Sequence, residues 1–179
     1  TQEGLRLMAT DHLNVIERKL IDTLRSGTYN TTDGVGSGSA WASGSVIVFG
    51  QFPEPEDAKY PCIIVEMIAH GVEEQFMGQL ISSGSSTAIG ELYGVGFNLY
   101  CMVDRNSSMT VSTVAYKQRR LLNYLMLNCA NVVMDCDFAT TDTAVEERHY
   151  TGFRQMGYNP ELEIWVAQTS MLIMFKNTR

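Results

Sequence analysis

The sequence predicts an α+β fold in a single domain: a mostly antiparallel, twisted β-sheet with a long hairpin, packed against two amphipathic helices. Apolar residues recur at helical spacing in two segments, and at strand spacing or without interruption in several others. No repeat or linker divides the 179 residues. We therefore expect one domain over residues 1–179, with flexible loops at about 30–45 and 78–90.

The first helix is expected to end before Gly27, because glycine is the preferred residue just after a helix C-terminus. Three basic residues lie toward its C-terminal half, where the helix dipole favours cations. Its apolar stripe, mostly at spacings of three and four, consists of Met8, Leu13, Ile16, Leu20 and Leu24.

A long hairpin is expected in the middle of the chain. After a short β-branched strand at 45–49, three prolines at 53, 55 and 61 predict a loop. The apolar run CIIVEMI at 62–68 then predicts a strand that continues through HGVEEQF. The glycine- and serine-rich stretch 78–90 is expected to form the hairpin tip. The returning strand, ELYGVGFNLYCMVD, alternates apolar and more polar residues at a period of two.

The second helix is expected after N-cap candidates at 106–108, followed by a possible strand at 131–138 and a polar connection at 139–147. Two C-terminal strands are expected to meet at a turn at 157–160, the last running over 162–175. The residues predicted to share one face of the second helix are Val111, Val114, Ala115, Leu122, Leu125, Met126 and Cys129.

The composition excludes several functional classes. A net charge of −7 argues against a protein that neutralises nucleic-acid phosphates. No apolar run approaches the roughly 20 residues of a membrane helix, and the first residues do not form a signal peptide. The cysteines at 62, 101, 129 and 136 are widely spaced, which favours buried, reduced thiols over disulfides.

The glycines at 34, 36 and 38 do not predict a phosphate-binding loop. Their spacing is G-x-G-x-G, and a helix precedes and a strand follows, which is the reverse of a dinucleotide fingerprint. The Walker sequence Gly-Lys-Ser/Thr is absent. Flexible chain is the preferred interpretation.

No other motif indicates catalysis. The three histidines lie in different elements, and Asp135-Cys136-Asp137 is interpreted as a solvated strand end rather than a cation site. No G-x-S-x-G nucleophile turn occurs in a strand-to-helix context. We therefore predict no catalytic, cofactor-binding or metal-ligating residue, and a protein that is not an enzyme.

Apolar side chains in the two glycine-rich segments are the first candidates for contact with a partner. They either fold back on their own domain or become ordered against neighbouring subunits. On the second interpretation, residues 33–43 can be deleted without unfolding the domain. The candidates are Trp41 in the first segment and Phe76, Met77, Leu80 and Ile81 around the second.

A basic group on the polar side of the second helix is another candidate. It consists of Lys117, Arg119 and Arg120, which can pair with acidic patches on a neighbouring subunit. The alternative is an ordinary solvated helix face.

The order of the segments is informative as a whole. An amphipathic helix is followed by a proline-rich entry ending in YPCIIVE and by a hairpin returning as GELYGVGFNLYCMVD. The helix VSTVAYKQRRLLNYLML then precedes NPELEIWVAQTSMLIMF. In this order, over about residues 5–175, the chain resembles the tail terminator (tail completion) proteins of tailed bacteriophages. That family has no invariant catalytic or ligand motif, so no functional residue is carried over.

The resemblance implies a structural virion protein of the tail or neck, assembled in the host cytoplasm. Such a protein forms a homo-oligomeric ring, six-membered in that family, which caps the tail tube protein and docks on the head–tail connector. In contractile tails the ring also meets the sheath protein. Genomic DNA passes through the pore without sequence-specific binding, which suits a negatively charged chain. No membrane contact and no cofactor are implied.

Two further classes remain open. One is another neck or head–tail joining protein of the same kind of particle, an adaptor or a stopper, which ring size and position would distinguish. The other is a cellular enzyme or small-molecule-binding domain. A monomer that retains a metabolite or a metal would indicate that second class.

Overall fold

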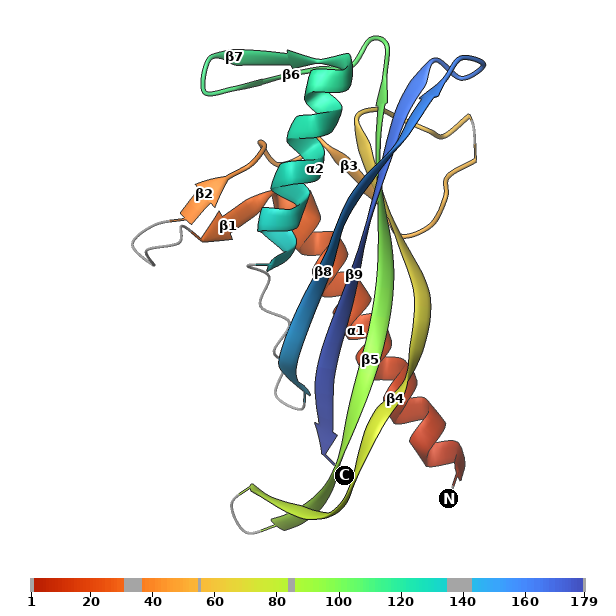
Figure 1. The fold of residues 1–179 in the computed structure, drawn as a ribbon, viewed down its shortest axis with the longest axis vertical. Coiled ribbons are helices and arrows are strands. Elements are labelled where there is room, and N and C mark those ends of the chain that lie inside the picture. Colours follow the sequence, from red (N-terminus) through yellow and green to blue (C-terminus); the bar gives the residue numbers. More distant parts are fainter. Residues whose placement is uncertain (1, 31–36, 55, 84–85, 135–142, 179) are drawn as a thin grey trace.

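A five-stranded sheet and two helices make up most of the fold, as Figure 1 shows. The computed structural model describes residues 2–30, 37–54, 56–83, 86–134 and 143–178. The sheet has the order β3-β4-β5-β9-β8. Its strands are β3 (Ile47–Phe49), β4 (Cys62–Ser83), β5 (Ser86–Asp104), β8 (Thr143–Asn159) and β9 (Ile164–Thr178). The helices are α1 (Gln2–Ser26) and α2 (Gln118–Met134).

The strand directions follow from the connections. β3 pairs parallel with the first three residues of β4, whereas β4–β5, β5–β9 and β9–β8 are all antiparallel. The β4–β5 hairpin is the longest unit, and its pairing continues from Cys62↔Met102 to Ser83↔Ser86 with three register shifts. The predicted α+β fold with a mostly antiparallel sheet and a long hairpin is therefore confirmed.

One hydrophobic core lies between the helices and a single face of the sheet. β5 supplies its centre, because every second side chain from Val95 to Val103 is fully buried in that core. Cross-strand partners such as Val65 on β4 and Ala167 on β9 extend the same surface. The helices contribute their predicted stripes, of which Ile16, Leu20, Leu24, Leu122 and Leu125 are fully buried.

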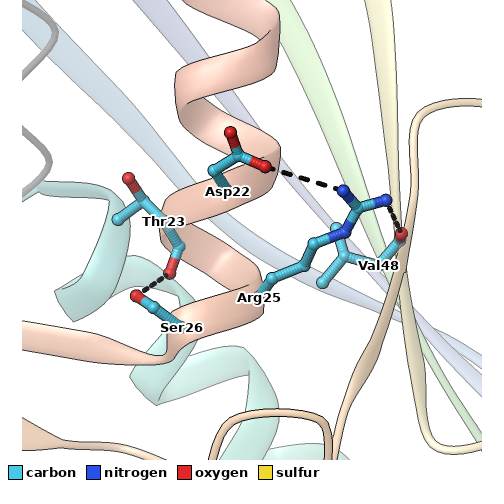
Figure 2. A network of polar contacts seen from close by, with 5 residues as sticks. All are labelled: Asp22, Thr23, Arg25, Ser26 and Val48. Atoms are coloured by element: carbon cyan, nitrogen blue, oxygen red, sulfur yellow. Dashed lines mark hydrogen bonds and ion pairs between the residues drawn. The ribbon is translucent and has the colours of Figure 1, made fainter.

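The end of α1 is fixed to the sheet by polar contacts (Figure 2). The Arg25 guanidinium donates a 3.2 Å hydrogen bond to the carbonyl of Val48 on β3 and lies 3.6 Å from the Asp22 carboxylate. The Ser26 hydroxyl donates to the Thr23 carbonyl at 2.8 Å, which satisfies an acceptor of the last helical turn. Gly27 follows with φ +64°, as predicted for a residue after a helix C-terminus.

Trp41 corrects one prediction from the sequence. Its side chain is 1% exposed, and its indole N–H donates a 3.0 Å hydrogen bond to the Leu24 carbonyl. The next residue back, Ala40, is also buried, and its carbonyl accepts a 2.6 Å hydrogen bond from the Tyr124 hydroxyl. Trp41 therefore folds back on its own domain and is not available to a partner. The expectation that residues 33–43 are dispensable for folding is wrong for the same reason.

The two expected loops are also shorter than predicted. β1 (Thr28–Asn30) pairs antiparallel with β2 (Ser37–Ser39), so part of the region 30–45 is a small hairpin, and 31–36 lie outside the described residues. In the region 78–90, β4 continues to Ser83 and β5 begins at Ser86. Backbone pairing thus extends almost to the tip of the hairpin.

The second helix begins and ends later than the sequence suggests. Its expected first turns form a hairpin instead, β6 (Ser108–Val111) paired with β7 (Val114–Lys117). The two turn residues, Ser112 and Thr113, have φ values of 46° and 72°, the left-handed conformation that tight hairpins require. β-branched residues on both sides favour strands, so Val111, Val114 and Ala115 do not belong to the helix face.

The strand expected at 131–138 is also wrong for residues 131–134, because α2 continues to Met134. Val132 and Val133 are fully buried in the core and continue the helical stripe that includes Cys129. Their burial in tertiary contacts outweighs the preference of valine for strands. Residues 135–142 lie outside the described part of the chain.

Two glycine substitutions separate the packing of Trp41 from backbone strain. Gly27 and Gly44 both have positive φ, at +64° and +82°. A Cβ at Gly27 would lie 2.4 Å from the Trp41 indole nitrogen, whereas nothing lies within 4 Å of one at Gly44. We expect Gly44→Ala to cost about 1–2 kcal/mol of unfolding free energy and Gly27→Ala about 1–3 kcal/mol more. Urea unfolding measures both, and equal losses would contradict the packing of Trp41 on Gly27.

Candidate interaction surface

The face of the sheet opposite the helices is only partly covered. The alternate residues of β5, from Asn98 to Asp104, point to this face and are half-buried. The loop between β3 and β4 covers a part of it, with the Phe52 ring 5.1 Å from the ring of Tyr100. Ile64 on β4, opposite Tyr100 in the register, is 1% exposed although it lies outside the helix-side core.

A ladder of polar side chains crosses three strands of this uncovered face. The Tyr100 hydroxyl donates to Glu66 at 2.9 Å, and the Asn98 amide N–H donates to the same carboxylate oxygen at 3.3 Å. The Ser170 hydroxyl donates to the Asn98 amide oxygen at 2.6 Å. Each group is thus satisfied by a neighbour on the adjacent strand, so the face can be half-buried without an orphaned polar atom in this ladder.

Several large apolar side chains near this face are exposed. On β8 this is Met156, which is 56% exposed. Tyr158 lies opposite Trp165, which packs against the core, and is therefore on the helix side of the sheet. Leu162 in the β8–β9 turn and Ile68 on β4 are more than half exposed. Apolar residues gathered around one sheet are typical of surfaces that contact other proteins.

Both edges of the sheet carry long runs of backbone without a partner strand. β8 is the last strand in the order, and among the described strands its 17 residues pair only with β9. At the other edge, β3 pairs with β4 only as far as Ile64, so among the described strands nothing pairs with the outer side of β4 beyond that point. An unpaired strand edge is a template for another strand, and proteins that keep long ones commonly use them in assembly.

The residues proposed from the sequence as partner contacts fall into three groups. Trp41 is buried, as described above. Phe76, Met77, Leu80 and Ile81 lie on β4, and the positions of their side chains are outside the described part of the structure. Lys117, Arg119 and Arg120 are exposed at the β7–α2 junction, so they remain candidates.

Sequence reasoning missed the polar ladder, because its members are far apart in the chain. Glu66 stands out only as the one charged residue in CIIVEMI, and Asn98 as a polar residue within a strand. The β4–β5 and β5–β9 registers bring them together, with Glu66 opposite Asn98 and Asn98 opposite Ser170. A charged residue inside an apolar strand was the available signal.

The three described thiols are buried. Cys62, Cys101 and Cys129 are free and buried, as predicted, and Cys136 lies outside the described residues. Burial, reinforced by the nearby Cys101, raises the pKa of Cys62 to about 12. The contact with Cys129 and burial likewise raise the pKa of Cys101 well above its ordinary value. Thiols held in the protonated state are poor nucleophiles.

Two further properties concern the described residues as a whole. No group of three or more histidine, cysteine, aspartate or glutamate side chains among them is arranged to hold a metal ion. No helix among them is both long and apolar enough to span a bilayer.

Comparison with known proteins leaves the family undetermined. No known protein-family model matches the chain, and no curated protein matches it significantly.

The raised pKa of Cys62 predicts a loss of stability in alkali. The folded chain keeps the thiol proton up to about pH 12, whereas the unfolded chain loses it from about pH 9. The unfolding free energy contributed by this thiol is therefore complete below pH 9 and falls as pH rises toward 12. Urea unfolding across this range should show a shallower decline for Cys62→Ala than for the wild type. Parallel declines for the two proteins would contradict a raised pKa of Cys62. Stability should still fall somewhat with pH in Cys62→Ala, because burial also raises the pKa of Tyr60.

Proposed function

We propose that this chain is a structural protein of a tailed bacteriophage, which forms a ring that terminates the tail tube and joins it to the head connector. DNA passes through the pore of that ring. The proposal combines the sequence resemblance, covering about residues 5–175, with a sheet whose two edges are suited to joining copies of the chain.

The direction of the edge strands is the observation that carries the proposal. Three successive antiparallel pairings separate β4 from β8, so these two strands run in opposite directions. If copies stand around an axis roughly parallel to the strands, β8 of one copy meets β4 of the next in antiparallel orientation. The alternation of strand directions then continues from copy to copy, and a closed ring leaves no edge unpaired.

The charge of the chain supports a pore rather than a nucleic-acid binding site. A chain of net charge −7 repels phosphates, so DNA can move through the ring without being held. The other surfaces of the sheet then supply contacts to the tube and the connector.

Native mass spectrometry over a concentration series, with electron micrographs of the same sample and of the sample mixed with tail tubes, tests this proposal. Rings with an open centre, located at tube ends, are the expected result. Rings that bind only the head connector would favour another neck component, an adaptor or a stopper. A chain that stays monomeric, leaves tubes uncapped and retains a metabolite or metal would contradict the proposal and favour the cellular alternative.

A matched pair of lysine substitutions tests the β8 edge. Met156 on β8 and Leu127 on α2 are almost equally exposed, at 56% and 57%. We expect Met156→Lys to weaken self-association about tenfold or more, since a charge would be buried in the contact. Leu127→Lys should have little effect, because it lies on the helix layer. Sedimentation at several concentrations measures both, and equal effects would rule out the β8 edge as the contact.

A further inference from the structure

One segment of this acidic chain contains basic residues and no acidic ones. Between Asp104 and Asp135 the sequence contains four basic residues and no acidic one. Three of them, Lys117, Arg119 and Arg120, lie at the β7–α2 junction and are exposed; we call them the basic cluster. No acidic residue occupies the first turn of α2. The positive end of the helix dipole therefore adds to the positive electrostatic potential of the three cations, because no nearby carboxylate on the helix offsets it.

An acidic cluster lies in the loop between β3 and β4. It consists of Glu54, Glu56 and Asp57, all exposed. A 2.9 Å hydrogen bond from the Asp57 amide to the Glu54 carbonyl holds the cluster in a turn. Lys59 follows in the same loop, which nevertheless keeps a net negative charge.

Among the described residues, no ion pair neutralises either cluster. The ion pairs of Arg25 with Asp22 and of Arg105 with Glu163 involve neither cluster. Three like charges in four residues repel one another unless opposite charges are brought near. Both clusters thus have charge available for an external partner.

The two clusters lie at the same end of the molecule but on opposite sides of it. α2 contacts β5, β9 and β8, whereas α1 contacts β3 at the other side of the sheet. The helix that begins at the basic cluster therefore lies over the β5, β9 and β8 part of the sheet. The acidic loop lies at the β3–β4 edge and reaches the uncovered face through Phe52. Figure 1 shows α2 beginning beside β6 and β7 on one side and the loop after β3 on the other.

We infer that the basic cluster of one copy binds the acidic cluster of the next copy, as the charged part of a head-to-tail contact. This inference rests on the proposed ring, because it joins the same two sides of the molecule as the β8 and β4 edges. Two different patches that complement each other make a heterologous contact, which closes into a ring or continues as a filament. Charge pairs of this kind fix the register of a contact and speed its formation.

A second copy suits the basic cluster better than nucleic acid does. The complementary cluster is present in every copy, with the same number of charges. The rest of the chain is acidic and repels phosphates at longer range.

Exchange of the charges between the clusters tests the inference. We expect K117E/R119E/R120E and E54K/E56K/D57K each to self-associate about tenfold or more weakly than the wild type, because like charges then face each other. An equimolar mixture of the two should regain assembly with alternating copies, since both kinds of contact become complementary again. R18E, which reverses an exposed charge on α1 outside both clusters and outside both strand edges, is the control and should assemble normally. A mixture that assembles no better than its components overturns the inference.

Carbodiimide cross-linking provides a readout that does not require stable rings. It joins a lysine amine directly to a carboxylate in contact, so chains labelled with heavy nitrogen are mixed with unlabelled chains. Peptides that join Lys117 of one isotope to residues 54, 56 or 57 of the other support the inference. Their absence overturns it, whether or not the wild type forms rings.

The outcomes separate this inference from the proposed function. If the wild type forms rings and neither charge reversal weakens them, the proposed ring is supported and the pairing of the two clusters is contradicted. If the wild-type chain neither assembles nor caps tubes, the proposed ring itself is contradicted. A third outcome is that the wild type binds a labelled DNA duplex, K117E/R119E/R120E does not, and no mixed-isotope cross-link forms. That outcome would indicate that the basic cluster binds nucleic acid.

Discussion

Both helices bury their apolar stripes against the same face of the sheet, through the alternate side chains of β5. The constraint is geometric, because a strand presents every second residue to one side, so a fully apolar run on that side requires cover. Val95, Phe97 and Leu99 are fully buried in this way. With both helices packed on one face, the β3–β4 loop is the described segment that covers part of the other face. The uncovered face and the two free edges follow from that allocation.

The uncovered face combines hydrogen-bonded polar side chains with exposed apolar ones. Its polar ladder, centred on Glu66 and Asn98, is satisfied by hydrogen bonds between strands and so tolerates partial burial. Exposed apolar side chains such as Met156 lie nearby. Because the polar groups of the ladder already have partners, covering this face would not leave them unsatisfied.

The spacing of apolar residues along the sequence predicted the elements whose pattern follows directly from helix or strand geometry. The stripe of α1, the glycine after it and the alternation along β5 were all predicted, because helix and strand periods are properties of the backbone itself. The prediction failed where distant contacts outweighed local preference. Val132 and Val133 favour a strand but are held in α2 by burial in the core. The β6–β7 hairpin replaced the expected first turns of the helix, since its turn chemistry had not been recognised.

Some features of the candidate site were likewise predicted from the sequence, and others depend on the tertiary structure. The sequence by itself determined the class of the fold, the net negative charge and the existence of a basic group at Lys117, Arg119 and Arg120. Only the tertiary structure decided that Trp41 is a core residue and that the basic and acidic clusters lie on opposite sides of the sheet. The physical reason is that burial and placement depend on residues far apart in the chain. The periodicity of the sequence predicts which face of an element a side chain lies on, but strand register and helix packing determine which residues it contacts.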